Sequence, residues 1–154
     1  MPYTKSVCVA GKTKEYEFYY SARYDRKRGS RRWKDNRTPE AAQKVNRRNA
    51  EKRLTRILNA NFDWTSLYVT LSYKKEDRPD AEGLRKDARM LLKKLRKVWR
   101  KRGRELKYVW VAERGERGAV HIHLVINGFQ GATGEIREAW KKGWICIKPL
   151  DRSG

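Results

Sequence analysis

The segment Val120–Val125 constrains the fold more than any other part of the chain. In it, apolar residues alternate with His121 and His123, the two histidines of the sequence, and this period of two is typical of a β-strand with one buried face. Alternate residues of a strand project to the same side, with Cα atoms roughly 6–7 Å apart. An imidazole buried without a partner is costly. We therefore predict that the two histidines bind one metal ion; a pair of half-buried sheet histidines without a ligand is the alternative.

A carboxylate is available for the same site. Glu113 lies eight positions before His121, and the short, glycine-rich Arg114–Gly118 between the two segments indicates a hairpin. Such a hairpin places Glu113 within reach of His121 or His123. Glu116 is the competing acid, but it lies in the turn, where a solvated carboxylate is expected. Two imidazoles and one carboxylate leave positions open around an octahedral ion, which suits Mg²⁺ or Mn²⁺; zinc with a catalytic water is the alternative.

Secondary-structure signals around the histidine segment predict an antiparallel sheet. The expected strands are Leu67–Tyr73, Lys107–Glu113, Val120–Asn127 and Trp144–Leu150. Asp80 is expected to cap a helix that ends near Gly103, and Thr133 a short helix closed by Gly143. Residues 67–150 therefore run β-α-β-β-α-β, the order of the ferredoxin-like α+β fold. In this fold both helices cover one face of the sheet and leave the other face free.

The residues before this unit are expected to extend it. The expected elements are strands at Ser6–Ala10 and Glu15–Tyr20, a basic loop at 25–35, and a helix from Pro39 to about Ala60. Thr38 provides a capping hydroxyl before a proline at the first helical position. We accordingly divide the chain into 1–38, the N-terminal strands and basic loop, and 39–154, the main domain.

The strong positive charge of the chain indicates a polyanionic partner. Lysine and arginine number 39 against 18 aspartate and glutamate, which gives a formal net charge of +21 and a pI near 10.3. Such a charge destabilises a compact fold by self-repulsion, so DNA or RNA is the expected partner. A membrane is not expected, because the sequence has no apolar run of roughly 18 residues and no signal peptide. Cys8 and Cys146 are too few for a zinc site or a disulfide framework, so we expect a cytoplasmic protein.

Two clusters of basic residues are the candidates for contacts with phosphates. They are Arg28, Arg31 and Arg32 in the basic loop, and Lys93, Lys94, Arg96, Lys97, Arg100 and Lys101 on the long helix. Such contacts supply the sequence-independent part of the affinity for nucleic acid. Trp33, Trp99 and Tyr24 are candidates for stacking on unpaired bases, with packing inside the protein as the equal alternative.

Taken in order, these motifs resemble those of a known family. The strand Leu67–Tyr73, a basic helix, and then Glu113, a glycine hairpin and His121-Ile122-His123 resemble the HUH endonucleases, and among them the rolling-circle replication initiators of phages and plasmids of the inovirus type. Leu67–Tyr73 is similar to their first motif, and Glu113 with the two histidines to their metal-binding second motif. The resemblance covers about residues 40–154. It implies site-specific nicking and joining of single-stranded DNA at a replication origin through a phosphotyrosine, with a divalent metal ion as cofactor and a host replication helicase as a further partner.

The sequence departs from this family at the nucleophile. Initiators of this motif order carry the tyrosine on a helix after the histidine strand, whereas the last tyrosine here is Tyr108. We therefore expect 39–154 to be a catalytic domain without its nucleophile helix, the tyrosine lying beyond Gly154.

Three alternatives to a replication initiator of this kind remain open. One is a relaxase-like enzyme with an N-terminal nucleophile; the tyrosines there are Tyr3, Tyr16, Tyr19, Tyr20 and Tyr24. Aromatic residues in such strands are more often core than catalytic. The second is an HUH-derived module that binds DNA without cutting it. The third is an RNA-binding protein with an RRM-like sheet, which the lack of stacking aromatics on two adjacent strands disfavours.

Overall fold

The computed structural model describes residues 3–20, 39–115 and 118–150. The chain divides into two compact units, 1–61 and 62–154, and each is described by itself. The helix that begins at Pro39 belongs to the first unit. The basic loop with Arg28, Arg31 and Arg32 lies outside the described residues, as do Trp33, Tyr24 and the turn residue Glu116.

The first unit is a β-hairpin with one helix. Strands β1 (Tyr3–Ala10) and β2 (Thr13–Tyr20) pair antiparallel, and α1 spans Pro39–Asn61. The turn contains Gly11 at φ 59°, where a Cβ would meet the carbonyl oxygen of Asn59 at 2.2 Å, so only glycine fits. The helix begins at its proline, as predicted.

Ion pairs join the hairpin to α1. The carboxylates of Glu15 and Glu17 on β2 bind Arg56 and Lys52 of the helix. No residue of α1 is buried, so its apolar positions form no core stripe. The tyrosines of β2 are also exposed, and the core position expected for Tyr16, Tyr19 and Tyr20 is wrong.

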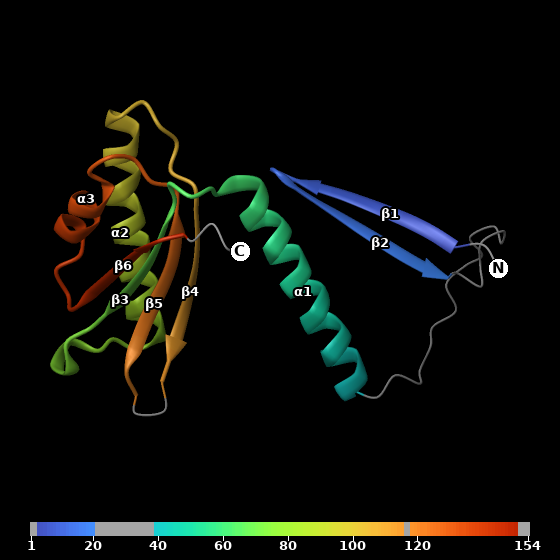
Figure 1. Ribbon diagram of the computed structural model, residues 1–154. Helices are drawn as coiled ribbons and strands as arrows, with labels where there is room; N and C mark the ends of the chain where they lie inside the picture. The colour runs from blue at the N-terminus through green and yellow to red at the C-terminus, as the bar shows by residue number, and fades with distance from the viewer. Residues whose placement is uncertain (1–2, 21–38, 116–117, 151–154) are drawn as a thin grey trace. The chain divides into compact units, whose positions relative to one another are not determined.

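The second unit has the predicted ferredoxin-like α+β architecture (Figure 1). Its elements are β3 (Leu67–Ser72), η1 (Lys75–Asp77), α2 (Ala81–Lys101), β4 (Tyr108–Arg114), β5 (Val120–Ile126), α3 (Ala132–Ala139) and β6 (Ile145–Pro149). The strands form one sheet in the order β4-β5-β3-β6, and every neighbouring pair is antiparallel. This order puts the first and third strands of the β-α-β-β-α-β unit side by side at the centre, and this pairing builds the site.

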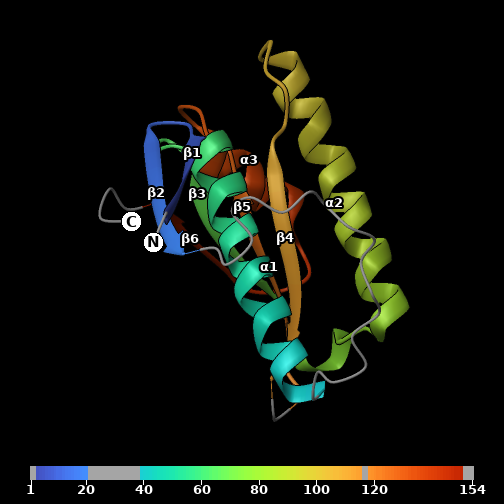
Figure 2. The same cartoon turned by 90° about the vertical axis from the view of Figure 1, so that its right-hand side faces the viewer.

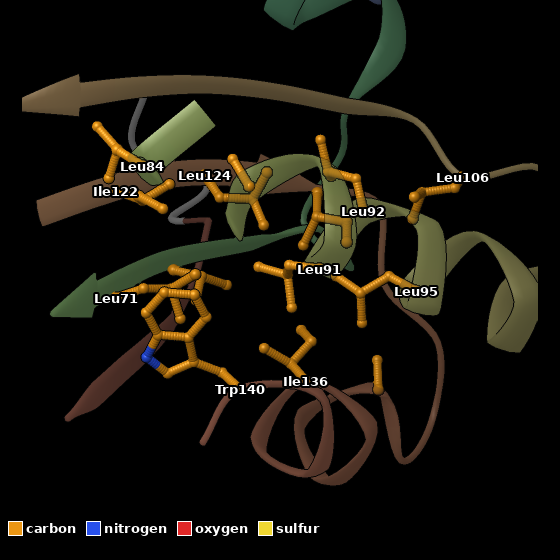
Figure 3. Close-up of a cluster of buried hydrophobic side chains, with 14 of the residues drawn as sticks. Leu71, Leu84, Leu91, Leu92, Leu95, Leu106, Ile122, Leu124, Ile136 and Trp140 are labelled. Atoms are coloured by element: carbon orange, nitrogen blue, oxygen red, sulfur yellow. The ribbon is translucent and has the colours of Figure 1, made fainter. Parts of the chain in front are cut away.

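One face of this sheet and the two helices enclose the core. Asp80 caps α2 as predicted, because its carboxylate accepts a hydrogen bond from the Gly83 amide at 2.7 Å. The helix then buries Leu84, Ala88, Leu91, Leu92, Leu95 and Trp99 against Val120, Ile122, Leu124 and Ile126 of β5. Figure 3 shows the four leucines of this helix beside Ile122 and Leu124. Each such leucine contributes about 1.5–3 kcal/mol on burial. Because β5 alternates, its two histidines project from the opposite face, which is called the open face below.

In this unit the structure contradicts one expectation and decides between two alternatives for another residue. Thr133 does not cap α3: Gly131, at φ 93°, holds the cap position, and Thr133 lies inside the helix. For Trp99, the alternative of packing inside the protein is the one observed, because its side chain is 0 % exposed and its ring packs edge-on against Phe129. The Trp99 Nε1 donates a hydrogen bond to the carbonyl of Asn127 at 3.1 Å.

Figure 2 shows the second unit from another side, with α2 alongside the sheet. In the ranges 3–20, 39–115 and 118–150, no helix combines the length and the apolar character needed to cross a membrane.

Candidate functional site

The strand register brings the predicted metal ligands together on the open face. Glu113 of β4 lies directly opposite His121 of β5, and Val111 lies opposite His123. Tyr108 and Trp110, the alternate residues of β4, pack towards the core. The prediction that Glu113 shares the histidine face is therefore correct, and the hairpin between β4 and β5 is the reason.

His123 makes the closest contacts in the site. Its Nε2 lies 2.9 Å from Oε2 of Glu113, and its Nδ1 lies 2.8 Å from Oη of Tyr68 and 3.3 Å from Oγ1 of Thr70. An ionised carboxylate only accepts hydrogen bonds, so Nε2–H of His123 donates to Glu113. Nδ1 of the neutral ring then accepts a hydrogen bond from the Tyr68 hydroxyl. The imidazole is thus held from both sides.

His121 lies beside this pair with an unused nitrogen. Its ring centroid is 6.3 Å from that of His123, with the ring planes tilted by 35°. Its Nδ1 is buried and has no hydrogen-bond partner among the described residues. A buried polar atom without a partner costs about 1–3 kcal/mol, so this nitrogen is available to a ligand.

The three side chains are close but do not already enclose an ion. In the part of the chain that the structure describes, no three His, Cys, Asp or Glu side chains are gathered in the positions that a metal ion requires. The gap of 2.9 Å between the ligand atoms of Glu113 and His123 suits adjacent ligands of a six-coordinate ion, which are about 3.0 Å apart for bonds of about 2.1 Å. The side chain of Glu113 is 64 % exposed, and among the described residues its carboxylate contacts His123 but no other histidine. Binding by all three residues stays a prediction.

Tyr68 and Thr70 are site residues that the sequence interpretation did not include. They lie on β3 opposite Val125 and His123, and the Tyr68 ring stacks on the His123 ring at 5.9 Å between centroids. The alternation of Leu67–Tyr73 does put both on the polar face of their strand. Their contact with His123, however, depends on β3 pairing with β5, which only the fold supplies.

The basic residues predicted on α2 are all exposed, but they lie across the sheet from the histidines. They are Lys93, Lys94, Arg96, Lys97, Arg100 and Lys101. The inner stripe of α2 packs on the core face, whereas His121 and His123 are on the open face. Arg96 and Arg100, together with Arg104 and Tyr108, line an open groove between the end of α2 and the start of β4. The second unit therefore has a histidine face and a separate basic face.

Comparison with known proteins identifies the second unit. A profile of the replication-associated protein ORF2/G2P family matches residues 66–154, which is more than half of the chain and includes every strand and helix of this unit. The chain has no significant match among curated proteins and none among solved structures.

Proposed function

The chain belongs to the replication-associated protein ORF2/G2P family, and on that premise we propose that it is a replication initiator of the HUH endonuclease type. Its open face binds one Mg²⁺ or Mn²⁺ ion through Glu113, His121 and His123. That face then holds single-stranded origin DNA for nicking and joining. The observation that carries this proposal is the contact between His123 and Glu113, with an unpartnered His121 nitrogen beside them.

The residues of the site fit a divalent ion. One carboxylate oxygen and two imidazole nitrogens leave positions of an octahedral ion open for phosphate oxygens. When bound, the ion polarises the scissile phosphate. Glu113, His121 and His123 would hold this ion, and the apolar Val109, Val111 and Val125 share the open face with them.

Tyr68 and Thr70 keep His123 in a usable orientation. In the free site, Nδ1 of His123 accepts from the Tyr68 hydroxyl. If Nε2 of His123 held a metal ion, Nδ1 would carry the proton and would donate to a hydroxyl oxygen instead. A hydroxyl serves both states because it donates and accepts. We therefore assign the two residues a positioning role.

In the covalent step the family resemblance implies, a tyrosine oxygen bonds to phosphorus while the bond from phosphorus to the 3′ oxygen breaks, releasing a 3′-hydroxyl. Among the described residues of the second unit, Tyr68 is the one tyrosine on the open face, and its hydroxyl is committed to His123. We propose that none of the tyrosines in this sequence is the nucleophile, so the 154-residue chain should give no denaturant-resistant adduct with an origin oligonucleotide. An adduct abolished by Tyr68→Phe, or by phenylalanine at one N-terminal tyrosine, would overturn this.

The metal site is tested by cleavage from a bound ion. Fe²⁺ takes the place of Mg²⁺, and with ascorbate and peroxide it produces hydroxyl radicals that cut the nearest polypeptide and DNA. The expected fragments end near Tyr68, Glu113 and His123, and excess Mn²⁺ suppresses them. His121→Ala/His123→Ala should lose these cuts, whereas Glu76→Ala, which removes an exposed acid of η1, should keep them. Cuts that persist in the double variant would refute the site.

A further inference from the structure

The hairpin of the first unit has one charged face and one apolar face. The charged face packs on α1, whereas the apolar face is exposed. Glu15 and Glu17 lie on the face that α1 covers, where they pair with Arg56 and Lys52. The cross-strand partners on the other face are Tyr3–Tyr20, Lys5–Phe18, Val7–Tyr16 and Val9–Lys14. We call these eight residues the aromatic hairpin face.

The large side chains of the aromatic hairpin face are exposed. Its aromatic and valine residues range from 51 % exposed for Val7 to 75 % for Tyr20. The helix of this unit cannot cover them, because it is held by the acids of the opposite face. A contiguous apolar patch on the surface marks an interaction site, whereas single exposed apolar residues scattered over the surface are ordinary.

The charge on this face is entirely positive. Lys5 and Lys14 lie among the aromatic rings, and among the eight residues there is no acid. The ammonium of Lys5 is 5.0 Å from the centre of the Tyr16 ring and 5.8 Å from that of Phe18. Both acids of β2 are on the other face and are paired there. The face therefore combines aromatic rings with positive charges. It complements a polyanion that carries planar bases.

We propose that the aromatic hairpin face binds single-stranded DNA by stacking unpaired bases on Tyr16, Phe18 and Tyr20, with Lys5 and Lys14 contacting phosphates. The three rings recur at every second residue of β2, about 7 Å apart, whereas bases in a duplex are about 3.4 Å apart. Their spacing thus fits an extended single strand. A second copy of the chain fits poorly, because it would bring the lysines of two faces together.

This site goes beyond the proposed function, because it assigns DNA binding to residues outside the family match. It needs no metal ion, so it is measured in EDTA, where the histidine site does not contribute. If the histidine site binds no metal ion, the DNA affinity measured in EDTA is unaffected. If the aromatic hairpin face binds no DNA, metal binding at the histidine site is unaffected.

The test is the affinity of the full chain for a fluorescent oligothymidine in EDTA. Phe18→Ala and Tyr16→Ala should each weaken binding by roughly 5- to 150-fold, the range for one stacked base, and Phe18→Trp should retain it. Tyr19→Ala is the matched control, because Tyr19 lies on the other face of the same strand. Circular dichroism and thermal unfolding should show that all variants fold. Photocross-linking of an iodouracil strand should label β2.

Three results would overturn the proposal. One is unchanged oligothymidine affinity in Phe18→Ala and Tyr16→Ala. Another is an equal loss of affinity for duplex and single strand, which would mean that unpaired bases are not recognised. The third is a concentration-dependent dimer that Phe18→Ala abolishes while DNA affinity stays the same, which would show that a second copy covers the face.

Discussion

Tyr68 of β3 and His123 of β5 are joined across the centre of the sheet by a hydrogen bond of 2.8 Å between Oη and Nδ1. Oγ1 of Thr70 lies 3.3 Å from the same nitrogen. On the other side of the ring, Nε2 contacts Glu113. The imidazole is therefore oriented by two flanking strands before any ligand is present, and this arrangement leads to the first prediction.

Removing the Tyr68 hydroxyl should weaken the metal site without unfolding the protein. Tyr68→Phe keeps the ring that stacks on His123 but deletes the group that holds Nδ1, so Mn²⁺ affinity should fall by about 10- to 100-fold, as for other groups that orient metal ligands. Titration calorimetry measures the affinity. Tyr108→Phe is the control, because it removes a hydroxyl of the same sheet far from the histidines. Equal Mn²⁺ affinity in Tyr68→Phe and Tyr108→Phe would show that Tyr68 does not position His123.

The core depends on Trp99 as its largest fully buried side chain. Trp99→Ala removes the ring that packs on Phe129 and the hydrogen bond to Asn127, so the free energy of unfolding should fall by about 3–5 kcal/mol. Urea unfolding measures it. Trp144→Ala is the matched control, since that ring is 67 % exposed and its loss should change stability by no more than about 0.5 kcal/mol. Similar losses for both tryptophans would contradict this account of the core.

The buried Tyr73 should make the fold sensitive to alkali. Burial raises the pKa of its hydroxyl, and the nearby Asp87 carboxylate raises it further. In the unfolded chain the hydroxyl ionises near the ordinary value of about 10. Stability from this group is therefore complete below about pH 10 and is lost as the pH rises above that value.

The check on Tyr73 is urea unfolding followed across the alkaline range. Tyr73→Phe should lower the steepness of the stability loss above about pH 10. A wild-type curve that runs parallel to that of Tyr73→Phe would show that Tyr73 does not link stability to pH.

Charge reversal on the basic face of α2 should weaken DNA binding without changing sequence preference. We expect Arg96, Lys97 and Arg100 to contact phosphates rather than bases, so Arg96→Glu, Lys97→Glu and Arg100→Glu should each lower the affinity for all oligonucleotides about equally. The slope of log K against log salt should fall by about 0.7 for each contact on a single strand. Fluorescence anisotropy at several salt concentrations measures both. A loss confined to one sequence would show that these residues read bases.

The local pattern of the sequence predicts the parts of the site that lie within one hairpin. Alternation in β5 puts His121 and His123 on one face, and the short turn brings Glu113 opposite His121, so the three lie on the same face as expected. The contact of Tyr68 with His123 needs strands far apart in the sequence to pair, which no local pattern supplies. Similarly, the positions of lysine and arginine on α2 show that they are exposed, but not that the core separates them from the histidines.

Other differences have local physical reasons. Thr133 is a good capping residue, yet α3 begins earlier because Gly131 adopts a positive φ that starts the turn. Tyr16 and Tyr20 have the pattern of a buried strand, yet α1 packs on the acidic face of the hairpin through ion pairs. In the hairpin, ion pairs of neighbouring residues thus outweighed the common tendency of strand aromatics to be buried.

The central claim is that Glu113, His121 and His123 bind one divalent metal ion, and calorimetric titration with Mn²⁺ tests it most directly. The wild-type chain should bind a single ion. His121→Ala/His123→Ala and Glu113→Ala should abolish or greatly weaken this binding, while the surface variant Glu76→Ala binds as the wild type does. Binding of the same strength and stoichiometry in the double histidine variant would contradict the claim.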